Sequence, residues 1–571
     1  MGVVGVLEGR RGAVGLAILA GVLLAFRLNE PGWFDNEGRF AEGAREMVLR
    51  GDYVTPYVNF FPLLTKPPLT QWLSAVVFRV AGPSEWARLV AIAAAMITLV
   101  VTCRLGARLY GEQVGLVAGA LLGTTAGFVL EARTLRPDCL VVAAVASAIF
   151  CWHVAETGLP ARRTRWLAAM YAIVGVGTLA KGIVPVTLAG VPIAFMSLRA
   201  HGLAAMRRLR VGMGLAIFVA VVLPWHVAAS LANPGFAWDY VVNQHILFLL
   251  NKKEPRDSEG DALWFYLAAF LGRSSPWVLF LPFTMQEAIR GRTGRAAGGI
   301  DGTQLLWLWV MATVGLFALV PSRLEHYSLP ALPAVALLAA RAWDLGREHG
   351  FARLGRLYLT TIGLALLAGG AFGYRYGEQM VAEQVYWLSQ SAGLMALVVP
   401  SAIVACLAGA LILAAVWRRS ASGIVMALVV GIVPFLAILV RALIAAEALF
   451  SWRPVARALE RVPSETELVF EAPVEYQIIG ALNFYTRRRI TMLEPPGGYA
   501  PPAYLKGRTA DMFITRDDLE QRWRSGRPVV LVSDPQTRRD SADGVAPTPY
   551  FVLDRFGDRW VLTNFPQAAA H

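Results

Sequence analysis

Charged residues follow the first apolar segment of this sequence at spacings that suit chemistry. Asp35, Glu37 and Arg39 lie close together, and Lys66 precedes two prolines further along the same polar segment. A carboxylate can accept a proton from a hydroxyl or an amine, and a lysine ammonium can bind a phosphate. Charge beside a bilayer is costly unless it lies in a loop or a water-filled cavity, so these residues predict a functional site. Structural roles also stay open. Asp35 could cap the N-terminus of a helix, and Lys66 could extend its ammonium group to the lipid headgroups at the membrane surface.

Two further charged residues lie beside apolar segments. Asp138 follows Arg136 and Pro137 directly before an apolar segment, and Lys181 is the lone lysine of a long stretch without other charges. Asp138 is predicted either to cap a helix or to orient a cation or a substrate hydroxyl. Lys181 could reach for the membrane surface or bind an anion.

The remaining polar candidates stand in two later segments. His245 precedes Lys252 in the polar segment 232–260, and Arg323 and Tyr327 belong to the turn SRLEHY at 322–327. A lone histidine of this kind is commonly structural or interfacial, so His245 is an open case. Five polar side chains in one short turn are unusual for a mere connector, and we expect this turn to take part in the site.

The elements that must position these residues are predicted to be membrane-spanning helices. Of the 571 residues, 56% are hydrophobic and 16% are charged, well below the charge content of a soluble domain. Apolar segments long enough to cross a bilayer predict a polytopic all-α protein with about thirteen spans. The predicted spans are 13–28, 87–103, 114–131, 139–155, 166–180, 182–199, 211–231, 264–284, 304–320, 327–341, 357–376, 393–416 and 423–445.

The arginines predict how these helices lie in the membrane. The net charge is +13, and the arginine clusters between spans all fall on one side under this count, which is the cytoplasmic side by the positive-inside rule. Because the basic residues are scattered and form no single patch, nucleic-acid binding is not expected. The segments 29–86, 131–138, 232–260 and 321–326 then meet on the outer face, together with Lys181, and there we expect the active site.

The C-terminal segment 451–571 differs from the first 450 residues, which form the predicted membrane domain. It has ordinary charge density and short apolar runs typical of strands at 467–472, 488–493 and 528–534. A Gly-Asp pair between two apolar runs predicts a hairpin over 550–564, and DDLEQRWRSG at 517–526 predicts a helix that ends at glycine. We therefore expect a small α/β domain outside the membrane.

Several motifs together resemble a known family, the bacterial aminoarabinose transferases. These belong with the protein O-mannosyltransferases among the C-type glycosyltransferases. The motifs occur in the family's order and cover nearly the whole chain. They are Asn-Glu-Gly-Arg-Phe-Ala-Glu at 36–42, Lys-Pro-Pro-Leu at 66–69, Arg-Pro-Asp at 136–138, Lys-Gly at 181–182, Pro-Trp at 224–225, Asn-Pro-Gly-Phe at 233–236, the segment 264–282 and Tyr-Ser-Leu-Pro at 327–330.

The resemblance implies roles for the candidate residues. Asp35 or Glu37 would be the base that activates the acceptor, Arg39 would support that base, and Asp138 matches a second essential acidic position. Lys66 and Lys181 would hold the lipid phosphate, with Tyr327 close to it.

Two departures from the family pattern concern the base and a metal. The family commonly has Asp where Asn36 stands, so Asp35 is shifted by one position and the base could be Asp35 or Glu37. Aminoarabinose transferases often have Glu where Thr65 stands, and that Glu can bind a divalent metal with a histidine, here His245. An arginine expected after this histidine is replaced, so Lys252, Lys253 or Arg323 could supply the phosphate contact.

The sequence thus predicts an enzyme of the bacterial inner membrane with its site on the periplasmic face. It would transfer aminoarabinose, or a related pentose or hexose, from undecaprenyl phosphate to lipid A or another envelope glycan. Two alternatives stay open: transfer to protein hydroxyls, and transport of a lipid-linked sugar. Membrane lipids are the other expected partners.

Overall fold

The protein is built around long helices that run side by side. The computed structural model describes residues 10–254, 260–290, 300–471, 479–493, 503–533 and 544–566. The principal helices of the first 450 residues are α1 (Arg10–Ala25), α4 (Leu89–Tyr110), α5 (Glu112–Gly123), α6 (Ala126–Ala132), α7 (Asp138–Thr157), α8 (Arg163–Lys181), α9 (Val184–His201), α11 (Val211–Ala232), α13 (Leu263–Arg273), α14 (Leu281–Arg290), α15 (Gly302–Leu319), α16 (Leu332–His349), α17 (Arg353–Gln384), α20 (Val398–Trp417) and α21 (Ala421–Ala445).

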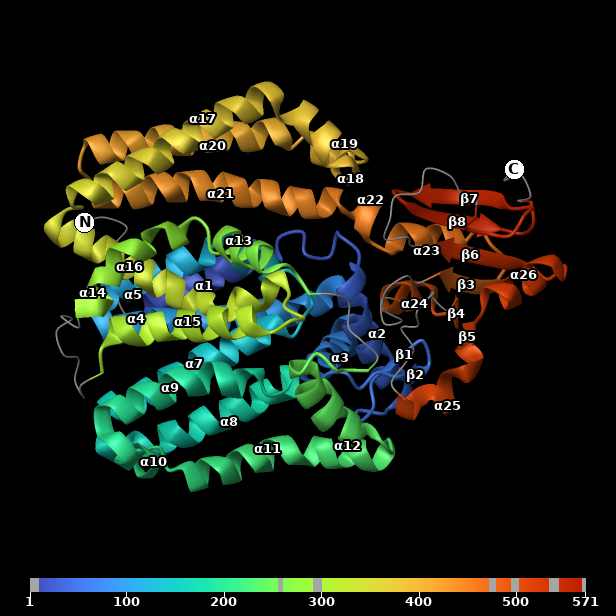
Figure 1. Ribbon diagram of the computed structural model, residues 1–571, viewed down its shortest axis with the longest axis horizontal. Coiled ribbons are helices and arrows are strands. Elements are labelled where there is room, and N and C mark those ends of the chain that lie inside the picture. The colour runs from blue at the N-terminus through green and yellow to red at the C-terminus, as the bar shows by residue number, and fades with distance from the viewer. Residues whose placement is uncertain are drawn as a thin grey trace.

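The helices form layers, with α17, α20 and α21 along one side and α8, α9 and α11 along the other (Figure 1). Every predicted span coincides with at least one helix. Among the described residues eight helices are long and apolar enough to cross a membrane, and nine if the bent pair α5–α6 is one span. The polytopic helical fold is therefore confirmed, while the number thirteen stays a prediction.

The polar segment after α1 is folded and does not form a loose loop. It contains α2 (Asp35–Arg50), an antiparallel pair of β1 (Tyr57–Val58) and β2 (Phe61–Pro62), and α3 (Leu69–Ala81). Helix α2 ends at Gly51, whose φ of +68° is a left-handed conformation that glycine adopts without a steric penalty. This segment presents its charged residues from regular elements.

The C-terminal domain holds a six-stranded sheet in the order β5-β4-β3-β6-β8-β7. Its strands are β3 (Glu467–Glu471), β4 (Thr491–Leu493), β5 (Phe513–Ile514), β6 (Val529–Ser533), β7 (Phe551–Phe556) and β8 (Arg559–Thr563). The first four in this order pair in parallel, and β8 and β7 are antiparallel. The predicted strands, the β7–β8 hairpin and the helix α26 (Arg516–Arg524) are all present.

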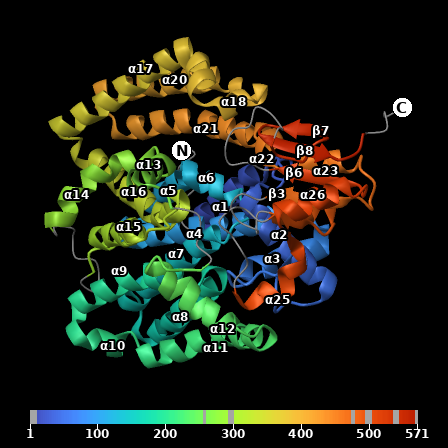
Figure 2. The same ribbon diagram turned by 45° about the vertical axis from the view of Figure 1, so that its right-hand side comes forward.

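This domain shares a hydrophobic core with the segment after α1. Trp33, Phe40 and Phe61 from that segment pack in one buried cluster with Trp452 and Phe470 of the domain. The domain therefore sits on α2 and α3 at one end of the helix layers, as both ribbon views show (Figure 1, Figure 2).

Candidate active site

A buried ion pair joins the start of α7 to the end of α8. Lys181 Nζ donates a hydrogen bond of 2.6 Å to Asp138 Oδ1, and the two side chains are only 11% and 7% exposed. The Lys181 ammonium also lies 4.6 Å from the centre of the Tyr327 ring, which comes from the turn η7 (Glu325–Ala331). Three segments far apart in the sequence thus meet at one lysine.

A second group of charges lies beside this pair. Arg273, the last residue of α13, donates to Glu325 at 2.8 Å and lies 3.9 Å from Glu131 of α6. Arg136 lies 4.0 Å from the same Glu131 carboxylate, and His326 lies 3.4 Å from Glu325. Cations and carboxylates alternate here, so a bound anion would meet guanidinium and imidazole groups as well as Lys181.

The pKa of Glu325 shows that the cations around this carboxylate dominate its surroundings. Burial alone would raise the pKa of the Glu325 carboxyl. The hydrogen bond with His326 and the positive charges of His326, Arg273 and Arg136 outweigh burial, and they lower the pKa to about 2. Glu325 is therefore ionised at neutral pH and balances part of the positive charge.

His245 packs against the backbone that follows Lys181. Gly182 has a φ of +65°, and a Cβ atom there would lie 2.9 Å from His245 Nε2 and 3.2 Å from the Tyr240 hydroxyl. Lys66 is close enough for its charge to act on His245. Lys66, His245, Gly182 and Lys181 thus form a continuous group, although 179 positions separate Lys66 from His245.

The His245 ring is held neutral. Burial lowers its pKa, and the charge of Lys66 lowers it further against the opposing hydrogen bond to the backbone of Tyr240. His245 Nδ1 lies 2.6 Å from the Tyr240 carbonyl oxygen, which can only accept, so Nδ1 donates and Nε2 is left as an acceptor in the neutral ring.

The neighbours of His245 do not fit a metal site. The groups placed around the ring are a lysine, a tyrosine, the backbone of Gly182 and one further histidine, His226, which packs on the same Tyr240 ring; position 65 is a threonine, so no carboxylate joins them from there. Throughout the described ranges, no group of three or more His, Cys, Asp or Glu residues could hold a metal ion. The expected divalent site at His245 therefore gains no support from these residues.

Glu37 is 1% exposed, and both oxygens of its carboxylate accept hydrogen bonds. Arg88 donates two hydrogen bonds to its carboxylate, of 2.8 and 2.6 Å, and the backbone amides of Phe34 and Leu135 donate to it as well. These contacts join the start of α2 to the 3-10 turn η2 (Glu85–Arg88) and to the turn before α7. Glu37 therefore has a structural role, because it holds these three segments together beside the site.

Asp35 and Arg39 lie on the same helix as Glu37. The backbone of Asp35 opens α2, while its side chain lies outside the described part of the chain. The Arg39 guanidinium lies 5.1 Å from the centre of the Phe40 ring, and the Arg39 backbone is packed against Gly480 of the C-terminal domain.

Lys252 and Arg323 make contacts of another kind. The Lys252 side chain is exposed, and its backbone amide donates to Leu247. Arg323 donates to the Asp261 carbonyl at 2.9 Å and accepts from the Asp261 amide through its own carbonyl at 2.7 Å. Arg323 thereby fixes the segment before α13 to the turn that carries Tyr327.

Known proteins share parts of this sequence. A family model described as dolichyl-phosphate-mannose-protein mannosyltransferase matches residues 65–227, a range that contains Lys66, Asp138 and Lys181. An undecaprenyl phosphate-alpha-4-amino-4-deoxy-L-arabinose arabinosyl transferase of Pseudomonas fluorescens is 27% identical over 343 residues, which are 58% of this chain and 59% of the relative. Its counterpart in Pseudomonas aeruginosa is 27% identical over 384 residues, which are 64% of this chain and 66% of the relative. The chain thus spans less than two thirds of the length of these relatives.

The crystal structure of ArnT from Cupriavidus metallidurans, bound to undecaprenyl phosphate, has a TM-score of 0.74 against this chain at 21% identity. The match covers 97% of this chain and 98% of that one. The chain has the aminoarabinose transferase fold. Archaeal oligosaccharyltransferase AglB from Archaeoglobus fulgidus shares the fold more distantly, with a TM-score of 0.50, 10% identity, and 91% and 69% of the two chains covered. The predicted C-type glycosyltransferase fold and the resemblance to the aminoarabinose transferases are confirmed.

Sequence reasoning named the lysines of this aminoarabinose transferase fold but missed several of their neighbours. Arg273 of the charged group and Arg88, which anchors Glu37, were missed, whereas Glu131 and His326 of the same group lie in segments that were expected on the outer face. Arg88 and Arg273 fall inside the predicted spans 87–103 and 264–284, where the apolar pattern around them gave no sign of a polar partner. The Glu131-to-Asp138 spacing was visible, but nothing local announced that α13 would bring Arg273 beside it.

Proposed function

We propose that this chain is an integral-membrane glycosyltransferase that moves a sugar from a polyprenyl-phosphate donor to an acceptor. The observation that carries the proposal is the meeting of Lys66, His245 and Lys181 at one place, with Asp138 and Tyr327 against Lys181. Cations held in a largely buried site suit a phosphate whose negative charge grows as the sugar leaves. The similarity to named arabinosyl transferases supports the same reaction class.

Lys66 and Lys181 would bind the donor phosphate. Asp138 fixes the Lys181 ammonium on one side and the Tyr327 ring supports it on another, so the lysine is positioned before the donor arrives. The neutral His245 adds no charge of its own, and its Nε2 can accept a hydrogen bond from the donor sugar or from a lysine.

Acceptor activation would fall to Asp35, because the Glu37 carboxylate already accepts hydrogen bonds from Arg88, Phe34 and Leu135. The acceptor oxygen or nitrogen would attack the anomeric carbon as its proton passes to Asp35. The bond between that carbon and the phosphate oxygen breaks, and the polyprenyl phosphate leaves with the electron pair. One displacement of this kind inverts the anomeric centre.

The donor we propose is undecaprenyl phosphate carrying aminoarabinose or a related pentose or hexose. The acceptor is lipid A or another envelope glycan, reached from the periplasmic face of the bacterial inner membrane. The names of the relatives support the donor, and the arginine distribution along the sequence supports the orientation.

Transfer of a sugar to protein hydroxyls is the second candidate. The family model that matches residues 65–227 favours it, because that model is described as a protein mannosyltransferase. The acceptor distinguishes the two candidates, since the proposed handling of the donor phosphate is the same in both.

The test is a transfer assay with the purified protein in closed lipid vesicles. Undecaprenyl phosphate carrying a labelled sugar would be offered with lipid A or with a serine- and threonine-rich peptide. We expect labelled lipid A, and loss of the label from the donor at the same rate. Labelled peptide without labelled lipid A would favour the second candidate. Movement of intact donor across the membrane without turnover would contradict both.

A further inference from the structure

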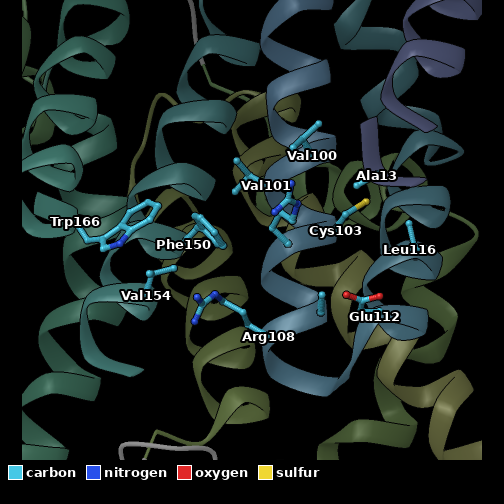
Figure 3. A pocket seen from close by; sticks show the side chains of 12 residues that line it. Ala13, Val100, Val101, Cys103, Arg108, Glu112, Leu116, Phe150, Val154 and Trp166 are labelled. Atoms are coloured by element: carbon cyan, nitrogen blue, oxygen red, sulfur yellow. The ribbon is translucent and has the colours of Figure 1, made fainter. Parts of the chain in front are cut away.

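A cavity lies at the end of the helix layers that is opposite the candidate active site. It has a volume of about 520 Å³ and opens between α1, α4, α5, α7 and α8 (Figure 3). Asp138 of the active site begins α7, whereas Val154 in the cavity wall lies near the other end of that helix. The cavity is therefore about a helix length from the proposed chemistry, and its size is typical of a ligand site.

Most of the cavity wall is apolar. Val100 and Val101 of α4, Leu116 of α5 and Phe150 of α7 line it, and Trp166 of α8 closes one side (Figure 3). Because these helices are among those packed in the membrane part of the protein, an apolar chain entering between them would exchange lipid contacts for protein contacts. Tryptophan is also the residue that prefers the boundary between the membrane and water.

Two guanidinium groups stand in the same wall. Arg104 and Arg108 lie one turn apart on α4, and neither forms an ion pair within the ranges that the structure describes. Arg104 Nε is buried there without a hydrogen-bond partner, which is costly for a charged donor. The cavity thus offers donors that its own walls leave unused.

Glu112 at the start of α5 is the one carboxylate of the cavity wall, among the residues described. Figure 3 shows its carboxylate and the Arg108 guanidinium pointing in different directions. Two guanidinium groups against one carboxylate leave a positive balance. A hydroxyl on the same ligand could donate to Glu112, whereas a second anionic group would be repelled by it.

From this combination we infer that the cavity binds an anionic glycerophospholipid. Its phosphate would accept hydrogen bonds from Arg104 and Arg108, a headgroup hydroxyl would face Glu112, and an acyl chain would follow Val100, Val101 and Leu116. Basic pockets between membrane helices are suited to anionic headgroups. A bound lipid here would bridge α1, α4 and α8 at the end of the protein that carries no catalytic group.

The test is lipid binding to the purified full-length protein after detergent removal of bound lipid, measured by native mass spectrometry. Phosphatidylglycerol is the probe, and phosphatidylethanolamine and glycerol phosphate are the comparison ligands. We expect phosphatidylglycerol to bind most tightly. Replacing both arginines, in Arg104→Gln/Arg108→Gln, should weaken it about 25-fold, or about fivefold for each arginine.

Two further variants keep the result decisive. Arg207→Gln removes one exposed arginine outside the cavity and should leave phosphatidylglycerol binding unchanged. Leu116→Trp fills the apolar part while keeping both arginines, and should also reduce binding. Equal binding of phosphatidylethanolamine, tighter binding of glycerol phosphate, or unchanged phosphatidylglycerol binding by the folded double variant would overturn the inference.

Discussion

Glu37 and Asp138 show that two carboxylates of one site can have separate tasks. The Glu37 carboxylate binds the fully buried Arg88 and two backbone amides, and so fixes the start of α2. Asp138 binds a lysine that also faces an aromatic ring. The first carboxylate holds the framework, and the second positions the cation that we assign to the donor phosphate.

The structural part of Glu37 predicts a particular pattern of stability. Glu37→Gln leaves the Arg88 charge buried without its partner, which should lower the free energy of unfolding by about 3 kcal/mol. The double variant Glu37→Leu/Arg88→Met removes both charges and should recover much of that loss. Thermal unfolding of the purified variants measures both effects. A fully stable but inactive Glu37→Gln protein would instead point to a catalytic part for this residue.

The carboxyl of Glu325 predicts how stability depends on pH. Its pKa in the folded protein is about 2, below the value of about 4.3 in an unfolded chain. Glu325 therefore stabilises the folded state above about pH 4.3, and this contribution is lost as the pH falls towards 2. The difference in unfolding temperature between the wild type and Glu325→Gln should shrink between about pH 5 and about pH 3. Glu348→Gln, at an exposed position, should show no such trend; a pH-independent difference for Glu325→Gln would refute the assignment.

At the scale of elements, α2 is the link between the site and the C-terminal domain. A Cβ atom on Gly38 would lie 2.3 Å from the backbone of Ala481 in α24 (Gly480–Thr486), so the two helices touch through glycine. Asn59, between β1 and β2, adds hydrogen bonds of 2.8 and 3.0 Å to Ile490 of the domain. The domain therefore buttresses the helix that opens with Asp35.

This close approach predicts that Gly38→Ala destabilises the folded protein. The added methyl group would press on backbone rather than on a flexible side chain, so we expect a loss of about 1 to 3 kcal/mol in the free energy of unfolding. Gly43→Ala on the same helix is the matched control, because its nearest neighbour is the Gln71 side chain at 3.3 Å. Denaturant unfolding of both variants checks the comparison, and equal stability would contradict the tight contact of α2 with α24.

How much of the fold and the site could be predicted depends on how far along the sequence each pattern acts. Local patterns predicted the long helices, the β7–β8 hairpin and the helix before Gly526, because hydrophobic period and turn residues act within a few positions. The pairing of Arg88 with Glu37 and the approach of Arg273 to Glu131 depend on how distant helices pack. The same holds for the shared core with Trp452, since a segment that reads as a separate domain gives no local sign of its partner.

Taken as a whole, the molecule separates two kinds of chemistry along its helices. The charged residues that we assign to sugar transfer lie at the end that carries the C-terminal domain, and the basic cavity with Arg104 and Arg108 lies at the other. The helix layers between them are apolar, and α4 and α7 are mostly buried at their centre. Such a division suits an enzyme that meets a lipid-linked donor at one membrane face.

The central claim is that Lys66 and Lys181 together hold the phosphate of a polyprenyl-linked sugar. Its most direct test is the rate at which the purified protein releases polyprenyl phosphate from labelled donor in the presence of acceptor. We predict that Lys66→Met/Lys181→Met lowers this rate at least about 100-fold, while Arg79→Gln, an exposed cation at the end of α3, changes it less than about twofold. Donor turnover by the folded double variant at the wild-type rate would contradict the account.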